Sequence, residues 1–280
     1  ICGFLGPNGA GKTSTIRMIL GLSAPSSGRL EVLGAPDGRR VRDRIGFLPE
    51  ERGLYRKMTP VDAIAFFAGL KGVPTQEGRR RAVRLLEEQG LGESMHKPMK
   101  ALSKGMAQKV QLMATIAHEP ELVILDEPFS GLDPVNQQGL EALIRGLAER
   151  GATVLFSTHV MQHAERLCRS VVLLAKGRKV FEGTVGDARA AAPRHLELEG
   201  ALTDAEAAAL PGVVGVDAIA REGLEPGVSV WSARLAPGAH PQAAVRAAIE
   251  RGLDVRRFEM REPSLHDAFI VLTGEGGDAR

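Results

Sequence analysis

Apolar and polar positions along residues 1–190 alternate between two patterns. Short, largely apolar runs occur at 1–5, 122–125 and 153–156, and such runs are typical of strands buried on both faces of a parallel sheet. Longer segments between them, above all 60–118, repeat apolar residues at the spacing of an amphipathic helix. The alternation predicts an α/β fold with a mostly parallel sheet and an α-helical subdomain over about 60–118.

Two further segments of this first part have strand-like patterns. Residues 28–50 predict two strands joined by a basic loop, and residues 170–185 predict a hairpin that turns at Gly177. Beyond residue 194 the apolar and polar positions alternate with a shorter period. The predicted strands are 195–200, 213–219, 228–235 and 254–260, and the predicted helices are 241–252 and 264–274. These elements predict a small C-terminal α+β accessory domain over 195–275.

The charge balance changes at the same place in the chain. Residues 196–280 carry 14 acidic and 8 basic side chains and no lysine, whereas residues 1–195 carry 20 acidic and 28 basic ones. This change predicts a domain boundary near Ala190, so that 1–190 forms the first domain. The whole chain has a net charge of only +2, which argues against nucleic acid as a partner.

The number of cysteines and the lengths of the apolar runs limit the class of protein further. Cys2 and Cys168 are far apart in the sequence, so we expect no disulfide framework and a reducing compartment such as the cytosol. No apolar run approaches the roughly 20 residues that span a bilayer.

A glycine-rich segment directly follows the first apolar run. Its sequence GPNGAGKT matches the phosphate-binding pattern G-x-x-x-x-G-K-[ST], with a predicted strand before it and a predicted helix after it. Glycines allow backbone N–H groups to wrap closely around phosphate oxygens. Lys12 is expected to reach the β- and γ-phosphates and Thr13 to bind Mg²⁺, and the alternative is a glycine-rich turn that only resembles the motif. The expected nucleotide contacts are Gly6, Pro7, Asn8, Gly9, Ala10, Gly11, Lys12, Thr13 and Ser14.

An acidic pair ends the apolar run LVILDEP. Asp126 lies at the carboxyl end of the predicted strand, where it is placed to hold Mg²⁺ through water. Glu127 follows it, where a carboxylate can align and polarise an attacking water. The alternative is a solvated acidic pair that caps a strand, but the phosphate-binding motif in the same chain favours the catalytic interpretation.

A histidine follows the next apolar run, in LFSTH. His159 is placed to donate a hydrogen bond to the γ-phosphate. His163 lies four residues later, a spacing that also suits a metal pair on a helix. No third ligand is evident, so we favour an ordinary surface position for His163.

The segment KALSKGMAQKV predicts a second anion site. Ser103 precedes a predicted helix with Gly105 in its first turn, where free N–H groups and the helix dipole attract anions. One chain therefore carries one complete phosphate site and one spare anion site. Two chains arranged head-to-tail would complete two sites.

Five motifs in this order, GPNGAGKTS, LSKGM, LVILDEP, SGLDP and STH, resemble those of the ATP-binding cassette (ABC) ATPases over about residues 1–190. The resemblance implies a P-loop ATPase that uses ATP and Mg²⁺, with Lys12, Glu127 and His159 as catalytic residues. It also implies that Ser103 and Gly105 contact the γ-phosphate held by the other subunit, and that Asp133 lies at the dimer seam.

Two motifs depart from the family pattern. The family signature usually reads LSGGQ, whereas this chain has Lys104 and Met106 in it. Glu50, in FLPEERGLY, stands where the family has glutamine; we expect it to bind Mg²⁺, and the alternative is a loop acid that pairs with Arg52 or Arg56. Both departures, and the tail EPSLHDAFIVLTGE, resemble the branch that serves ABC-2-type exporters, including sodium- and drug-efflux systems.

The family pattern also predicts that the first domain lacks its N-terminal strands. Members carry an outer strand and an aromatic residue that stacks on adenine before the phosphate loop, whereas here Ile1 opens almost directly on that loop. We expect a truncated start, and no residue is assigned to adenine.

The resemblance implies partners at the cytoplasmic face of the cell membrane. These are a second copy of the chain or a paralogous ATPase subunit, and an integral-membrane permease. Leu54, Tyr55 and Met58 are candidate contacts for a short permease helix, with local core as the alternative. The alternative function is a soluble ABC-type ATPase not coupled to transport. The sequence has none of the coiled coils of DNA-repair members, the second cassette of translation factors or the N-K-x-D motif of GTPases.

Overall fold

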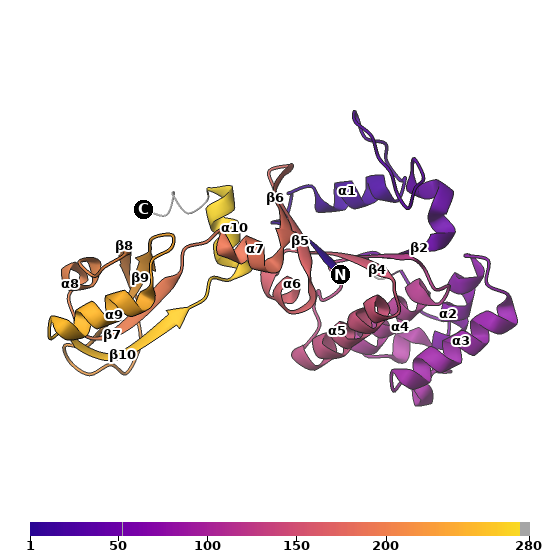
Figure 1. Ribbon diagram of the computed structural model, residues 1–280. Helices are drawn as coiled ribbons and strands as arrows, with labels where there is room; N and C mark the ends of the chain where they lie inside the picture. The colour runs from indigo at the N-terminus through magenta and orange to yellow at the C-terminus, as the bar shows by residue number, and fades with distance from the viewer. Residues whose placement is uncertain (52, 275–280) are drawn as a thin grey trace. The chain divides into compact units, whose positions relative to one another are not determined.

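The computed structural model describes residues 1–51 and 53–274 (Figure 1). Arg52, which sequence analysis gave as an alternative partner of Glu50, lies outside the described residues, as does residue 275 at the end of the expected C-terminal domain. Within the described part of the chain, no helix is long and apolar enough to cross a membrane.

The first compact unit, Ile1–Thr184, is built on a six-stranded sheet with the order β2-β3-β4-β1-β5-β6. Neighbouring strands are parallel from β2 to β5, and β6 pairs antiparallel with β5 after the expected turn at Gly177. Because β1, β3 and β4 run the same way side by side, the loops that follow them meet at one edge of the sheet. The strands are β1 (Cys2–Leu5), β2 (Ile45–Leu48), β3 (Leu122–Asp126), β4 (Thr153–Thr158), β5 (Ser170–Ala175) and β6 (Arg178–Thr184).

Helices cover both faces of this sheet, which is why its central strands carry long apolar runs. Figure 1 shows α1 on the opposite side of the sheet from α4 and α5. Ile124 and Leu125 of β3 and Phe156 of β4 are fully buried between these layers. The helices packed on the sheet are α1 (Lys12–Ile19), α5 (Pro134–Glu149) and α6 (Met161–Leu167).

Three helices form the predicted helical subdomain and share one apolar core. Ile64, Leu86 and Met113, one from each helix, are fully buried in it. The Thr59 hydroxyl accepts a hydrogen bond from the Asp62 amide and so caps the first of them. The helices are α2 (Pro60–Gly69), α3 (Thr75–Glu88) and α4 (Lys104–Ile116), and the 3₁₀ helices of the first unit are η1 (Gly38–Arg44), η2 (Gly92–Ser94) and η3 (Met99–Ala101).

One predicted strand is wrong. The first strand expected within 28–50 is reduced to an isolated bridge between Val32 and Ala35. A strand is stable only when a neighbour satisfies its backbone groups, and no other strand of the described chain pairs with this segment. The second strand of that segment forms as β2.

The second compact unit starts at Val185, slightly before the boundary that sequence analysis placed near Ala190. It contains an antiparallel sheet with the order β10-β7-β9-β8. Together with α8 and α9 this gives the β-α-β-β-α-β arrangement of ferredoxin-like folds. Sequence analysis missed α8, a short helix capped by Thr203. The elements are α7 (Val185–Ala190), β7 (His195–Ala201), α8 (Asp204–Ala208), β8 (Val213–Ala218), β9 (Ser229–Leu235), α9 (Pro241–Glu250), β10 (Asp254–Arg261) and α10 (Leu265–Thr273).

Candidate active site

The glycine-rich loop between β1 and α1 needs its glycines for two different reasons. A Cβ atom on Gly6 would lie 2.3 Å from the Leu174 carbonyl oxygen, so no larger residue fits. Gly9 and Gly11 have φ angles of 80° and 100°, a left-handed conformation that other residues adopt only at a cost. The sequence therefore folds into a tight loop whose amides lead directly into α1.

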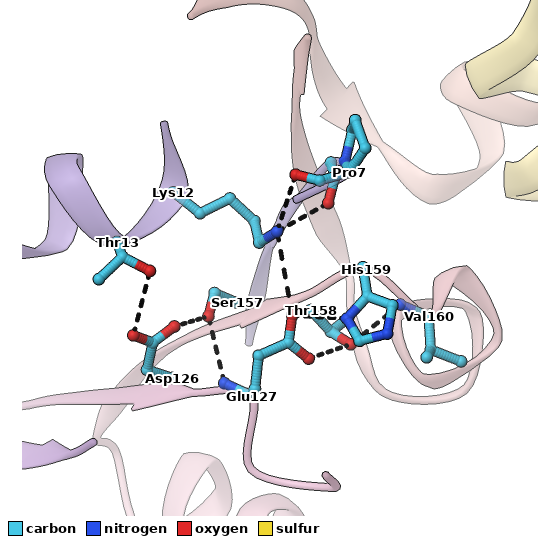
Figure 2. Close-up of polar contacts among 10 residues, drawn as sticks. Pro7, Lys12, Thr13, Asp126, Glu127, Ser157, Thr158, His159 and Val160 are labelled. Atoms are coloured by element: carbon cyan, nitrogen blue, oxygen red, sulfur yellow. Dashed lines mark hydrogen bonds and ion pairs between the residues drawn. The ribbon is translucent and has the colours of Figure 1, made fainter. Parts of the chain in front are cut away.

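Lys12 begins α1 and is almost completely buried, with 7% of its surface exposed. Its ammonium group donates to the carbonyl oxygens of Gly6 at 2.7 Å and Pro7 at 3.2 Å (Figure 2). Its Nζ atom also lies 3.9 Å from Oε1 of Glu127. The charge is thus fixed at the centre of the loop, next to the acidic end of β3.

Asp126 is held by hydroxyl groups on both of its carboxylate oxygens. Thr13 Oγ1 lies 3.4 Å from Oδ2, and the Ser157 hydroxyl donates to Oδ1 (Figure 2). Asp126 is 5% exposed, so these contacts offset part of the cost of burying a charge. Sequence analysis missed Ser157; its position as a polar residue at the end of the otherwise buried β4 was the available signal.

Glu127 has a backbone φ of 45°, a left-handed value for a residue with a side chain. Its amide donates to the backbone oxygen and to the hydroxyl of Ser157, both at 3.2 Å. Its Oε2 atom accepts from the Thr158 hydroxyl at 3.1 Å, and its Oε1 atom lies 2.9 Å from Nδ1 of His159 (Figure 2). Because a carboxylate only accepts, Nδ1 of His159 carries the proton in this contact. This network holds a strained backbone in place, which is common at functional sites.

A cavity of about 230 Å³ lies over this network. It gathers residues from four separate segments, including Glu50, whose side chain is exposed after β2. Gly6 and Pro7 hold Lys12 through their carbonyl groups, and Ala10 is buried below the loop. The lining residues are Asn8, Gly9, Gly11, Lys12, Thr13, Ser14, Glu50, Asp126, Glu127 and His159.

The remaining expected nucleotide contacts lie outside this cavity. Ser103 caps α4 by accepting from the Met106 amide at 3.2 Å, and Asp133 caps α5 by accepting from the Asn136 amide at 3.0 Å. A Cβ atom on Gly105 would lie 2.2 Å from Cγ of Asn136, so the first turns of the two helices are in close contact. We call these five residues, Ser103, Gly105, Met106, Asp133 and Asn136, the signature edge.

The proposed surface position of His163 is wrong. His163 is 6% exposed in α6, and its ring stacks on Phe129 with a centroid distance of 4.3 Å. His159 precedes that helix. Among residues 1–51 and 53–274, no group of three or more His, Cys, Asp or Glu side chains could hold a metal ion.

This arrangement defines a P-loop nucleotide hydrolase: a phosphate loop precedes a helix, an acidic pair lies at the end of β3, and a histidine follows β4. The ABC transporter family model matches residues 1–130. Because relatives that are more than 30% identical cover nearly all of it, the chain belongs to this family as an ABC transporter ATPase.

Individual relatives cover most of the chain. It is 37% identical to the uncharacterized ABC transporter ATP-binding protein YhaQ of Bacillus subtilis (strain 168), over 97% of this chain and 89% of that protein. It is 32% identical to the daunorubicin/doxorubicin resistance ATP-binding protein DrrA of Streptomyces peucetius, over 100% of this chain and 86% of that protein. A solved ATP-binding subunit of an ABC transporter matches with a TM-score of 0.60 and 37% identity, over 67% of this chain and 80% of that one.

Proposed function

We propose that this chain drives an ABC-2-type export permease by ATP-dependent closure of a head-to-tail dimer at the cytoplasmic face of the membrane. The exporter assignment is supported by relatives such as DrrA, whose name refers to resistance to two drugs. The dimer assignment is supported by one observation, the separation of the phosphate cavity from the signature edge within one chain.

The cavity supports a division of roles among its side chains. Lys12 carries the positive charge for the β- and γ-phosphates, and Glu127 lies beside it with its carboxylate oriented by Thr158 and His159. We assign Glu127 to orienting the attacking water and His159 to stabilising the transferred charge. Phosphoryl transfer depends mainly on such positioning and electrostatics.

The oxygen donors in the cavity fit a magnesium ion. Thr13 supplies a hydroxyl group, and Asp126 and Glu50 supply carboxylates, which are the donors that Mg²⁺ prefers. Two carboxylates and one hydroxyl leave coordination positions for water and phosphate oxygens, as is usual for Mg²⁺. When bound, the ion would neutralise charge on the phosphates.

The signature edge of one chain is suited to contact the phosphates bound in the cavity of the other chain. Ser103, Gly105 and Asp133 lie at the amino ends of α4 and α5, where helix dipoles favour anions. Ser103 and Asp133 are exposed. Two chains placed head-to-tail bring each edge over the other chain's cavity, which completes both sites.

A separate apolar cavity of about 210 Å³ between β2, α2 and α4 fits a permease contact. Leu54 and Phe67 line it. Beside it, Tyr55 is 60% exposed and Phe66 is 42% exposed, and their rings contact edge-on at 6.1 Å. Exposed aromatic residues next to an apolar pocket are typical of binding surfaces. Met58, the third candidate, is half-buried.

Glu127→Gln tests the proposed function. The amide keeps the size of the side chain but removes the charge that orients water, so we expect ATP binding to persist, hydrolysis to fall on the order of a hundred-fold or more, and a dimer to accumulate with ATP. Gel filtration with and without ATP measures the dimer. Glu149→Gln, at the exposed end of α5, is the matched control. A purely monomeric Glu127→Gln protein at saturating ATP would refute the head-to-tail arrangement.

A further inference from the structure

We propose that His163 is a positioning residue for ATP hydrolysis: its ring holds Phe129, and thereby fixes the loop that joins Glu127 to Asp133. The inference rests on the roles proposed above for these two acidic residues.

The ring of His163 has a defined partner on the acidic loop. It stacks on Phe129 with an interplanar angle of 21° and a centroid distance of 4.3 Å. Phe129 is 4% exposed and also contacts Phe156 of β4 edge-on at 6.0 Å. Phe129 is therefore fixed from two sides, although it lies in a loop only two residues after Glu127.

His163 is itself held by charged neighbours on α5 and α6. The guanidinium of Arg166 donates to its Nδ1 atom at 2.9 Å and forms an ion pair with Glu141 at 2.8 Å. Because arginine only donates, Nδ1 accepts and the proton of the neutral ring is on Nε2. Burial, aided by the charge of Arg166 and opposed by Glu141 and Glu127, lowers the pKa of His163 below its usual 6.5, which favours the neutral ring.

The segment from His159 into α6 therefore contacts the acidic loop twice. His159 contacts the Glu127 carboxylate, and His163, four residues later, contacts Phe129. These two contacts support the strained φ of 45° at Glu127, which persists only when its surroundings hold it.

The same loop also connects the cavity to the signature edge. The buried side chain of Gln108, in α4, donates to the Pro128 carbonyl at 3.1 Å, and Gln137 donates to the Leu132 carbonyl at 3.0 Å. Asp133 then caps α5. A shift of Phe129 would thus change both the orientation of Glu127 and the presentation of Asp133 to a partner chain.

Two substitutions of His163 separate the ring from its hydrogen bond. His163→Phe keeps an aromatic ring on Phe129 but removes the acceptor for Arg166, whereas His163→Gln keeps an acceptor and removes the ring. We expect kcat for ATP to stay within about three-fold for His163→Phe. For His163→Gln and for Phe129→Ala, we expect it to fall on the order of ten- to a hundred-fold, because small misplacements of reacting groups have effects of this size.

The KM for ATP should change little in all three variants, because Lys12 and the phosphate loop are untouched. The unfolding temperature of each full-length variant is measured, and kcat is determined well below it, so that unfolding cannot explain a lower kcat. His96→Ala, an exposed histidine of the helical subdomain, is the control. The double variant His163→Gln/Phe129→Ala should be no slower than the slower single variant, since both remove one contact.

Three outcomes would overturn the inference: equal kcat in His163→Gln and wild type, loss of kcat in His163→Phe but not in His163→Gln, or additive losses in the double variant. The control for the underlying function is Glu127→Gln. If that variant hydrolyses ATP normally, the proposed role of Glu127 fails; if it is inactive and His163→Gln is fully active, only the present inference fails.

Discussion

The phosphate cavity and the signature edge both present polar groups at the beginnings of helices, but they differ in how those groups are satisfied. In the cavity, Lys12, Asp126 and Glu127 are almost completely buried and contact one another or hydroxyl groups of α1 and β4. At the signature edge, Ser103 and Asp133 are exposed and accept hydrogen bonds from residues of the helices that they cap. The first region is ordered by its own chain, whereas the second offers N–H groups and a helix dipole to something outside it.

This difference assigns nucleotide binding and association of two chains to separate regions of the molecule. Changes in the cavity should affect nucleotide binding by one chain, and changes at the edge should affect association of two chains while leaving binding intact.

Lys12→Ala should have the largest effect. It removes the two charge-assisted contacts that we propose Lys12 makes to the β- and γ-phosphates, each worth about 1.5–3 kcal/mol, so ATP affinity should fall roughly 100-fold or more. Isothermal titration with ATP measures this loss, and Lys97→Ala, an exposed lysine of the helical subdomain, should bind normally. Unchanged ATP affinity in Lys12→Ala would overturn the assignment of the phosphate loop.

Gly105→Ala should have the next largest effect, and it should be confined to association. The added methyl group would clash with Asn136, whose side-chain amide donates to Asp133 at 2.5 Å. Asn136 therefore cannot move away without disturbing the signature edge. Overpacking of this kind costs about 1–3 kcal/mol, and we expect an ATP-dependent dimer roughly ten-fold weaker in the Glu127→Gln background. Analytical ultracentrifugation measures it.

The matched control for that change is Gly69→Ala. Gly69 ends α2 and a Cβ atom there has no neighbour within 4 Å, so the dimer should be unaffected. Reduced ATP affinity in monomeric Gly105→Ala would contradict the independence of the two regions.

Asp133→Ala should weaken both the cap of α5 and the dimer, and Asp133→Asn separates the two effects. Asparagine caps helices about as well as aspartate, so thermal stability should fall for the alanine variant only. Hydrogen bonds from the amide and side chain of Asn136 lower the pKa of Asp133, so it is charged at pH 7. If the dimer needs this charge, both variants should associate more weakly than wild type in sedimentation experiments.

His118→Asn should have the smallest effect, on the acid stability of the fold rather than on either region. Burial, with the charges of Lys71 and Arg81 and against that of Asp43, lowers the pKa of His118 to about 4. The unfolded chain therefore takes up this proton first as pH falls, and the free energy of unfolding decreases between about pH 6.5 and pH 4. Urea denaturation across that range should show a shallower decrease for His118→Asn. An identical decrease would show that this group does not contribute.

The cavity was predictable because its chemistry is concentrated in short motifs. Lys12 and Thr13 are adjacent, Asp126 and Glu127 are adjacent, and each pair ends or follows a run that can only be a buried strand. Parallel pairing then brings those strand ends together. Glu50 was also assigned from its motif, and the cavity lining includes it.

Other contacts depend on side chains that have no motif of their own. Nothing in the local pattern pairs Gly105 with Asn136 or His163 with Phe129, because these residues meet only when helices pack. The strand expected near Val32 does not form because strand formation also depends on distant segments. Its apolar pattern is strand-like, but no strand of the described chain pairs with it.

Apart from α8 and the strand expected near Val32, the sequence by itself determined the main strands and helices along the chain, the phosphate loop and the acidic residues beside it, because periodicity and close chemical spacing act over a few residues. Tertiary structure alone decided that Gly105 packs against Asn136 and that His163 is buried against the acidic loop. Those placements depend on packing between distant segments, where burial and hydrogen-bond satisfaction are set by the whole fold.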